Sequence, residues 1–225
     1  EASAPLPPEL AAQPRPAFQP GVTVLRGSEE GRLCVGLYLA APDWHHPDYV
    51  PILLLTRILG VYKKLAFRVG EAEGRASPLF RLAKDRAYVE QIEFMFSSYF
   101  LAGLFGLYIE GDAGRPAELL GFARQLLAEL PGMLTPEAIA YGRSKILSEL
   151  MCIDRADDVC QDLGSYLIYL NRNVSKAELV KRFALSMDAD VLRAAVERWV
   201  VGRPVSLTAV APPRAYEEVS RLAVE

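Results

Sequence analysis

The chain has 225 residues, of which 51% are hydrophobic and 24% are charged. It is therefore long enough to bury roughly 70% of its unfolded surface in one or two cores. The 25 basic and 28 acidic residues leave a formal net charge of -3, which argues against the positive field of a dedicated nucleic-acid-binding protein. The two histidines form one adjacent pair, His45 and His46, so the composition makes a self-sufficient metalloenzyme or histidine-dependent enzyme a poor candidate.

The cysteines indicate the redox state of the compartment, and the hydropathy tests for a membrane-spanning segment. The three cysteines lack C-x-x-C spacing, which favours a reducing compartment over a disulfide framework or a zinc knuckle. No signal-peptide pattern opens the chain, which begins at Glu1 and so invites the expectation of trimming or processing. The mean hydropathy of +0.13 is high, yet the uncharged stretch from Phe94 to Ile109 is shorter than the roughly 20 residues of a membrane-spanning helix. We interpret it as two buried strands joined by a short loop.

The first 20 residues carry many prolines and few large apolar side chains. The prolines are Pro5, Pro7, Pro8, Pro14, Pro16 and Pro20. This composition favours extended structure, and it predicts a linker or arm over residues 1–20, followed by one folded domain over residues 21–225. The domain opens with two apolar segments, Val22–Leu25 and Leu33–Ala41, separated by a polar turn. They predict two strands in a hairpin-like arrangement.

Helix and strand signals alternate over the next 60 residues. Apolar spacing predicts a helix from Tyr49 that ends at Gly60, and Ser77-Pro78 starts a short helix. Between them, the signal from Val61 to Gly74 is weak. Aromatic and β-branched residues then predict strands over Ala87–Phe96 and Leu101–Glu110.

The rest of the chain is mainly helical. Capping residues and apolar spacing predict helices that start at Pro116, at Thr135-Pro136, near Val159, after Ser175 and after Asp188. The second of these runs to about Cys152, and Val205–Ala211 is predicted as the last strand. This order of elements predicts an α+β fold, with helices packed on one face of a mainly antiparallel sheet.

The candidate metal sites have simpler structural explanations. His45 and His46 lack an acidic or cysteine partner at ligand spacing, so we interpret the pair as a turn before a helix. The acids Asp154, Asp157, Asp158 and Asp162 lack the order of a calcium-binding loop. Acids at a helix start are favoured by the helix dipole, and we adopt that interpretation.

Three other features leave alternatives open. The stretch Arg57–Arg86 holds eight basic and three acidic residues, a balance of about +5, and either faces anionic lipid or an acidic partner or forms a solvated rim. Cys152 and Cys160 are eight residues apart and are expected to share a helix face in the core. Gly103, Gly106 and Gly164 are expected to allow close packing, since no phosphate-binding motif surrounds them. No motif specifies a reaction, and the sequence predicts no catalytic, cofactor-binding or metal-binding residue.

Several short strings in a fixed order resemble a known family. They are Ala41-Pro42-Asp43-Trp44 with His46-Pro47-Asp48-Tyr49, Ile58-Leu59-Gly60, Ser77-Pro78-Leu79-Phe80, and Val159-Cys160-Gln161-Asp162-Leu163-Gly164. These resemble the C-terminal half of the pitrilysin-type metallopeptidases, specifically mitochondrial processing peptidase and the core subunits of respiratory complex III. The resemblance covers about residues 18–212. Cys160 and the lack of a long glycine-rich loop after Gly60 resemble the β-type subunit or the first core subunit.

The resemblance implies a LuxS/processing-peptidase-like metallohydrolase fold, in which an inverted H-x-x-E-H zinc site lies in the other, N-terminal half. Nothing in this sequence matches that site, so no cofactor is expected in this chain. The implied partners are a separate N-terminal half, a second core subunit and other complex III subunits, with anionic lipid as a further candidate and no nucleic acid. The implied location is the matrix side of the mitochondrial inner membrane, without a membrane span.

Three hypotheses follow. The first is a non-catalytic scaffold subunit of complex III, formed as a separate C-terminal half. The second is the non-zinc half of an active processing peptidase, which supplies wall contacts around presequence substrates. The third is a stand-alone binding module, which needs a deep apolar pocket with convergent polar groups.

Overall fold

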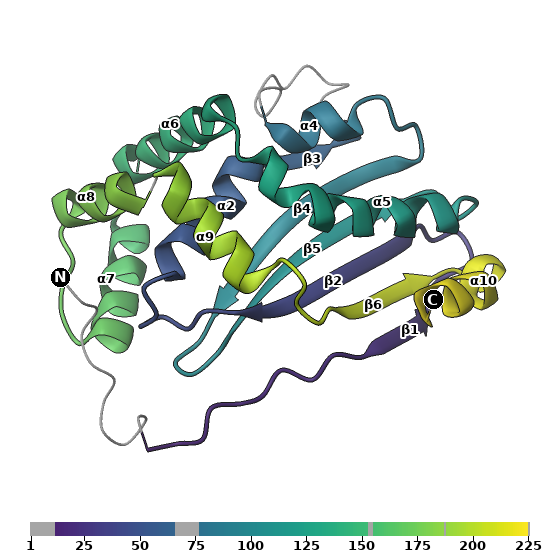
Figure 1. Cartoon of the computed structure of the whole chain (residues 1–225), viewed down its shortest axis with the longest axis horizontal. Coiled ribbons are helices and arrows are strands. Elements are labelled where there is room, and N and C mark those ends of the chain that lie inside the picture. The colour runs from purple at the N-terminus through teal and green to yellow at the C-terminus, as the bar shows by residue number, and fades with distance from the viewer. Residues whose placement is uncertain (1–11, 66–76, 153–154, 187, 225) are drawn as a thin grey trace.

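The fold is built on a six-stranded sheet with helices on one face (Figure 1). The computed structural model describes residues 12–65, 77–152, 155–186 and 188–224. The strands are β1 (Val22–Arg26), β2 (Leu33–Ala41), β3 (Val61–Lys63), β4 (Val89–Ser98), β5 (Gly103–Gly111) and β6 (Ser206–Ala211). They lie in the order β1-β6-β2-β5-β4-β3. The predicted α+β class is confirmed, and the sheet is mixed because β1 runs parallel to β6 while the other pairs are antiparallel.

Helices fill most of the chain between and after the strands. They are α2 (Tyr49–Leu59), α4 (Pro78–Ala83), α5 (Pro116–Glu129), the 3-10 helix η1 (Leu130–Met133), α6 (Pro136–Cys152), α7 (Ala156–Leu170), α8 (Lys176–Ser186), α9 (Ala189–Trp199) and α10 (Pro213–Val224). Several predicted starts are confirmed by their caps. The Ser77 hydroxyl accepts from Phe80 N at 3.2 Å, and the Ser175 hydroxyl accepts from Glu178 N at 3.1 Å. Gly60 ends α2 with a φ of 77°, a conformation that favours glycine.

The predicted hairpin of the first two strands is wrong. β6 lies between them, pairing Ala209 with Val24 on one side and with Val35 on the other. A strand from the far end of the chain therefore takes the edge of β2 that a hairpin partner would use. Two elements were also missed: β3, a three-residue edge strand in the stretch of weak signal, and α10, which follows the last predicted strand. Part of that stretch, and residues 1–11 of the predicted arm, lie outside the described residues.

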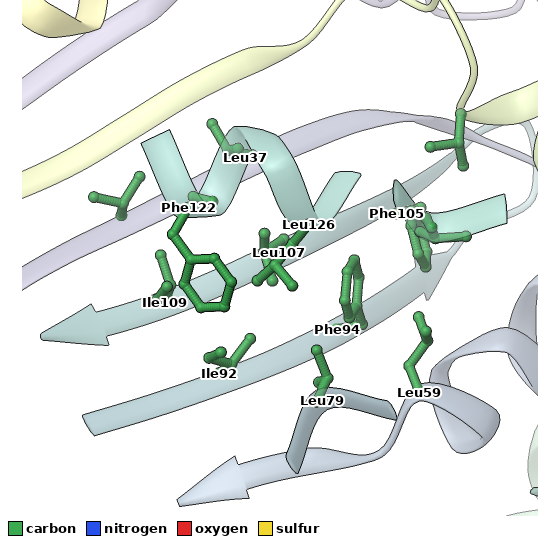
Figure 2. Close-up of a cluster of buried hydrophobic side chains, with 14 of the residues drawn as sticks. Leu37, Leu59, Leu79, Ile92, Phe94, Phe105, Leu107, Ile109, Phe122 and Leu126 are labelled. Carbon is green, nitrogen blue, oxygen red and sulfur yellow. The ribbon is translucent and has the colours of Figure 1, made fainter. Parts of the chain in front are cut away.

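The core lies between the sheet and the helices. Alternate residues of β2, β5 and β6 are buried on that side, as Leu37, Leu107 and Leu207 illustrate. Figure 2 shows Phe94 and Phe105 side by side on neighbouring strands, with ring centroids 5.5 Å apart. The stretch interpreted as two strands does form β4 and β5, and none of the described helices is long and apolar enough to span a membrane.

One carboxylate ties the start of α2 to the end of α9. The buried Asp48 Oδ2 accepts a hydrogen bond from Trp199 Nε1 at 2.8 Å and another from the Arg198 guanidinium. His46 adds an edge contact to the Trp199 ring, at 5.2 Å between centroids. Asp48 makes no side-chain cap of α2, so its contribution comes from holding the two helices together.

We expect Asp48→Ala to lower the free energy of unfolding by about 1–3 kcal/mol, because it leaves two donors of α9 without their shared acceptor. Urea denaturation followed by circular dichroism measures the change. Asp190→Ala is the matched control, since it removes an exposed partner of Arg193 and should alter stability by less than about 0.5 kcal/mol. Equal effects of the two variants would refute the role given to Asp48.

A second prediction concerns the contact between α2 and α6. A Cβ atom added at Gly142 would lie 2.8 Å from Ile58 Cα, whereas one added at Gly121 of α5 would meet nothing within 4 Å. Gly142→Ala should therefore destabilise the protein by about 1–3 kcal/mol. Gly121→Ala should leave stability unchanged or raise it by up to about 1 kcal/mol, because alanine favours a helix. Thermal and urea unfolding of both variants test the difference.

Candidate functional site

One face of the sheet is not covered by any described helix, and this face is a functional candidate (Figure 1). We call it the open sheet face. Its side chains come from the positions that alternate with the core positions: Cys34, Tyr38, Glu93, Met95, Leu104, Tyr108, Glu110, Thr208 and Val210. Successive side chains of a strand point to opposite faces of the sheet, which places these groups away from the core.

Polar groups gather at one end of the open sheet face. The Tyr108 hydroxyl lies 3.3 Å from Cys34 Sγ and 3.2 Å from Glu110 Oε2. Arg32 Nη1 donates to Glu110 Oε1 at 2.8 Å. Burial raises the pKa of Tyr108, and its hydrogen bonds to Cys34 and Glu110 raise it further. The phenol therefore stays protonated at neutral pH and can donate a hydrogen bond.

Apolar groups form the rest of the face. The Tyr38 ring lies over Gly36 and Gly106, where added Cβ atoms would come within 2.6 and 2.8 Å of ring atoms. Met95 and Leu104 lie nearby with 38% and 39% of their surface exposed. Gly103 likewise allows a close approach, to the Ala41 and Pro42 carbonyls. The close-packing prediction is thus confirmed for Gly103 and Gly106.

This combination of side chains fits binding. Protein–protein interfaces typically combine exposed aromatic, methionine and leucine side chains with hydrogen-bonding groups. In the described part of the chain, no group of three or more His, Cys, Asp or Glu residues is placed to hold a metal ion. The sequence did not predict this face, although Gly106, which pairs with Tyr38, and Gly36, two residues before Tyr38 on β2, carry its signal.

The histidine pair forms the predicted turn before a helix. His46 Nδ1 accepts from Asp48 N at 3.0 Å, and His45 N donates to Asp43 Oδ1 at 2.9 Å. Two acids of the cluster follow the interpretation as acids at a helix start, whereas Asp162 lies in the middle of α7 (Ala156–Leu170). Asp157 and Asp158 lie in the first turn of α7, and Arg155 lowers the pKa of Asp157. Asp154 lies outside the described residues.

The basic stretch makes many internal contacts. Arg57 Nε pairs with Glu149 at 3.0 Å, Lys64 Nζ pairs with Glu90 at 2.8 Å, and Arg86 lies over the Phe122 ring. Its residues 66–76 lie outside the described part of the chain. The described contacts favour a solvated rim, and lipid binding stays a prediction.

The interpretation of Cys152 and Cys160 as core residues on one helix face is wrong. Cys152 ends α6, Cys160 lies in α7, and both are exposed. The eight-residue spacing suggested one helix face, but the two cysteines belong to different helices. A Cβ atom added at the half-buried Gly164 would meet nothing within 4 Å, so its close-packing prediction is wrong as well. α7 instead exposes Leu163, Leu167 and Ile168.

We expect a maleimide reagent to label Cys152 and Cys160 before Cys34. The first two thiols are exposed, whereas Cys34 is half-buried and contacts Tyr108. Labelling under native conditions, followed by mass spectrometry of peptides, measures the order, and labelling in urea provides the control. Simultaneous labelling of all three thiols in the folded protein would contradict the structure.

Comparisons with known proteins identify the family. A family model described as "Peptidase M16 inactive domain" matches residues 1–146. The β subunit of human mitochondrial-processing peptidase is 21% identical over 205 residues, and the match covers 91% of this chain and 41% of that protein. Rat cytochrome b-c1 complex subunit 1 is 22% identical over 189 residues, covering 84% of this chain and 38% of that protein. The chain thus spans about two fifths of the length of these relatives.

Solved structures share the fold. A chain of complex III2 from Candida albicans, bound to Inz-5, has a TM-score of 0.74 at 12% identity, covering 92% of this chain and 50% of that chain. The peptidase M16 inactive domain from Pseudomonas fluorescens has a TM-score of 0.70 at 17% identity, covering 88% of this chain and 45% of that chain. The family's description as inactive agrees with the expectation that this chain has no catalytic site of its own. Since the family match spans more than half of the sequence, the chain belongs to the M16 peptidases as their inactive domain.

Proposed function

We propose that this domain is the non-catalytic half of a two-half M16 assembly and acts as a scaffold subunit, as in the core of respiratory complex III. The observation that carries the proposal is the open sheet face. A sheet covered on one side only leaves Met95 and Leu104 exposed and Tyr38 partly exposed, and apolar surface of this kind is stabilised when a partner covers it. The partner in this proposal is an N-terminal M16 half.

The N-terminal residues fit a connecting arm in this assembly. We assign residues 1–20 to a linker or arm and residues 21–225 to the domain. Where the arm is described, Arg15 Nη1 pairs with Asp43 Oδ2 at 3.1 Å, and Asp43 is only 3% exposed. The ion pair anchors the arm beside the turn that precedes α2.

The relatives supply the proposed setting. Rat cytochrome b-c1 complex subunit 1 is named as mitochondrial, and the Candida albicans chain comes from complex III2. By analogy, the further partners are a second core subunit and other complex III subunits. The proposed location is the matrix side of the inner membrane, held there by these partners.

A second candidate is the non-zinc half of an active processing peptidase. The β subunit of mitochondrial-processing peptidase is a relative over nine tenths of this chain. In this role, the open sheet face is a wall of the substrate chamber. Its Tyr108 hydroxyl and Glu110 carboxylate then offer hydrogen bonds to a peptide, and the zinc chemistry belongs to the partner half.

Co-purification tests the scaffold proposal. The tagged chain, isolated from its native cells in mild detergent, should migrate in a large complex with an M16 half or core subunit. A Met95→Asp/Leu104→Asp double variant should lose most of that association, because charges replace the apolar contact. Met151→Asp, at a 74% exposed position of α6, is the control and should keep it. A monomer without such partners would refute the proposal.

Activity of the same complex separates the two candidates. Cleavage of a presequence peptide that stops on addition of a metal chelator would support the peptidase role. Absence of turnover in an intact complex would exclude that role and leave the scaffold role.

A further inference from the structure

The outer edge of β1 pairs with none of the other described strands. β1 is the last strand of the described sheet and pairs with β6 on its inner side. Leu207 N donates to Gly21 O at 2.8 Å, and Gly27 N donates to Ala211 O at 2.8 Å. Hydrogen bonding alternates along a parallel ladder. The backbone N–H and C=O groups of the odd-numbered residues of β1 therefore point toward β6. The backbone groups of Val22, Val24 and Arg26 therefore point away from the sheet.

An apolar groove of about 540 Å³ opens beside this edge, on the helix side of the sheet. Val22, Leu207 and Leu37 stand opposite one another on β1, β6 and β2 and form a row across its floor. α5 forms one wall and the 200–205 loop the other. A strand added to β1 continues this row, about 4.8 Å beyond Val22. A side chain at that position lies at the mouth of the groove.

The rim of the groove carries exposed valine side chains and two arginines. Val22, Val201 and Val205 are 48%, 50% and 39% exposed. Arg124 and Arg203 line opposite walls and donate to main-chain carbonyls, of Leu222 at 2.9 Å and Arg198 at 2.7 Å. Neither guanidinium has an ion-pair partner among the described acids. An anionic ligand would balance these charges.

We propose that this groove and the β1 edge form a binding site for an extended, acidic peptide segment of a partner protein. The segment adds to the sheet as a seventh strand. Its main chain bonds to the outward groups of Val22 and Val24, an apolar side chain enters the groove, and flanking carboxylates meet Arg124 and Arg203. Strand addition of this kind combines main-chain hydrogen bonds with side-chain pockets.

The free edge decides between a peptide and a lipid-like acid. An alkyl carboxylate would fill the groove and meet the arginines, but it would leave the outward N–H and C=O groups of β1 without partners. A peptide strand can fill the groove, meet the arginines and bond to the outward groups of β1. The site faces the helix side of the sheet, so it is distinct from the open sheet face and does not depend on an M16 partner half.

The probe is the acetylated, amidated heptapeptide TETLTET, whose leucine and two glutamates lie on one face of a strand. Titration of the full chain, followed by amide NMR shifts and hydrogen exchange, should show saturable binding. The amides of Val22, Val24 and Arg26 should gain protection. The peptide with all backbone amides N-methylated is the matched control, and it should not bind because it cannot form the edge hydrogen bonds.

Variants separate the parts of the site. Val24→Pro removes an outward N–H but no bond to β6, and it should weaken binding about tenfold or more, as should Arg124→Ala/Arg203→Ala. Arg143→Ala, at an exposed position on α6, should leave affinity unchanged. Circular dichroism establishes that each variant is folded.

Four outcomes would overturn the proposal. In the first, the N-methylated peptide binds equally well, and in the second, no saturable shifts appear up to millimolar peptide. In the third, decanoate displaces the peptide while the β1 amides keep their protection from hydrogen exchange. In the fourth, sedimentation shows a concentration-dependent dimer that buries β1. The third assigns the groove to an alkyl carboxylate, and the fourth assigns the edge to a second copy of the chain.

Discussion

One-sided burial of the sheet is the constraint on which the rest of this structure depends. Core residues such as Val35, Phe105 and Ala209 are fully buried on the helix side, and every described helix contributes to that layer or packs around it (Figure 1). The hydrophobic effect of this layer is the main force that holds strands from both ends of the chain together. The opposite face then has side chains suited to contact with another protein, and the proposed scaffold role follows from that asymmetry.

Within the helical layer, α2 is the central element. Its Ile52, Leu55 and Ile58 side chains are fully buried, Gly142 lets α6 approach it closely, and Asp48 connects its start to α9. The buried side chains of α2 therefore serve the stability of the domain, and the two binding proposals concern its surfaces.

The two proposed binding surfaces differ in the chemistry that they offer. The open sheet face presents a broad area of aromatic and apolar groups, with the Cys34, Tyr108 and Glu110 cluster at one end. The outer edge of β1, which no other described strand pairs with, lies beside a groove whose lining includes Arg124 and Arg203. The first suits a folded partner and the second an extended segment, so one domain of this size can take part in two contacts at once.

The sequence by itself determined the local structure and the absence of a recognisable reaction motif. Caps at Ser77 and Ser175, the glycine that ends α2 and the helical spacing of apolar residues predicted most helices, because these signals act within a few residues. Only the tertiary structure decided that β6 separates β1 from β2, that Cys160 is exposed, and that Tyr38 meets Gly106 on an uncovered face. Those features depend on which distant segments compete for one sheet edge or one surface, and that competition is settled by the free energy of the whole folded chain.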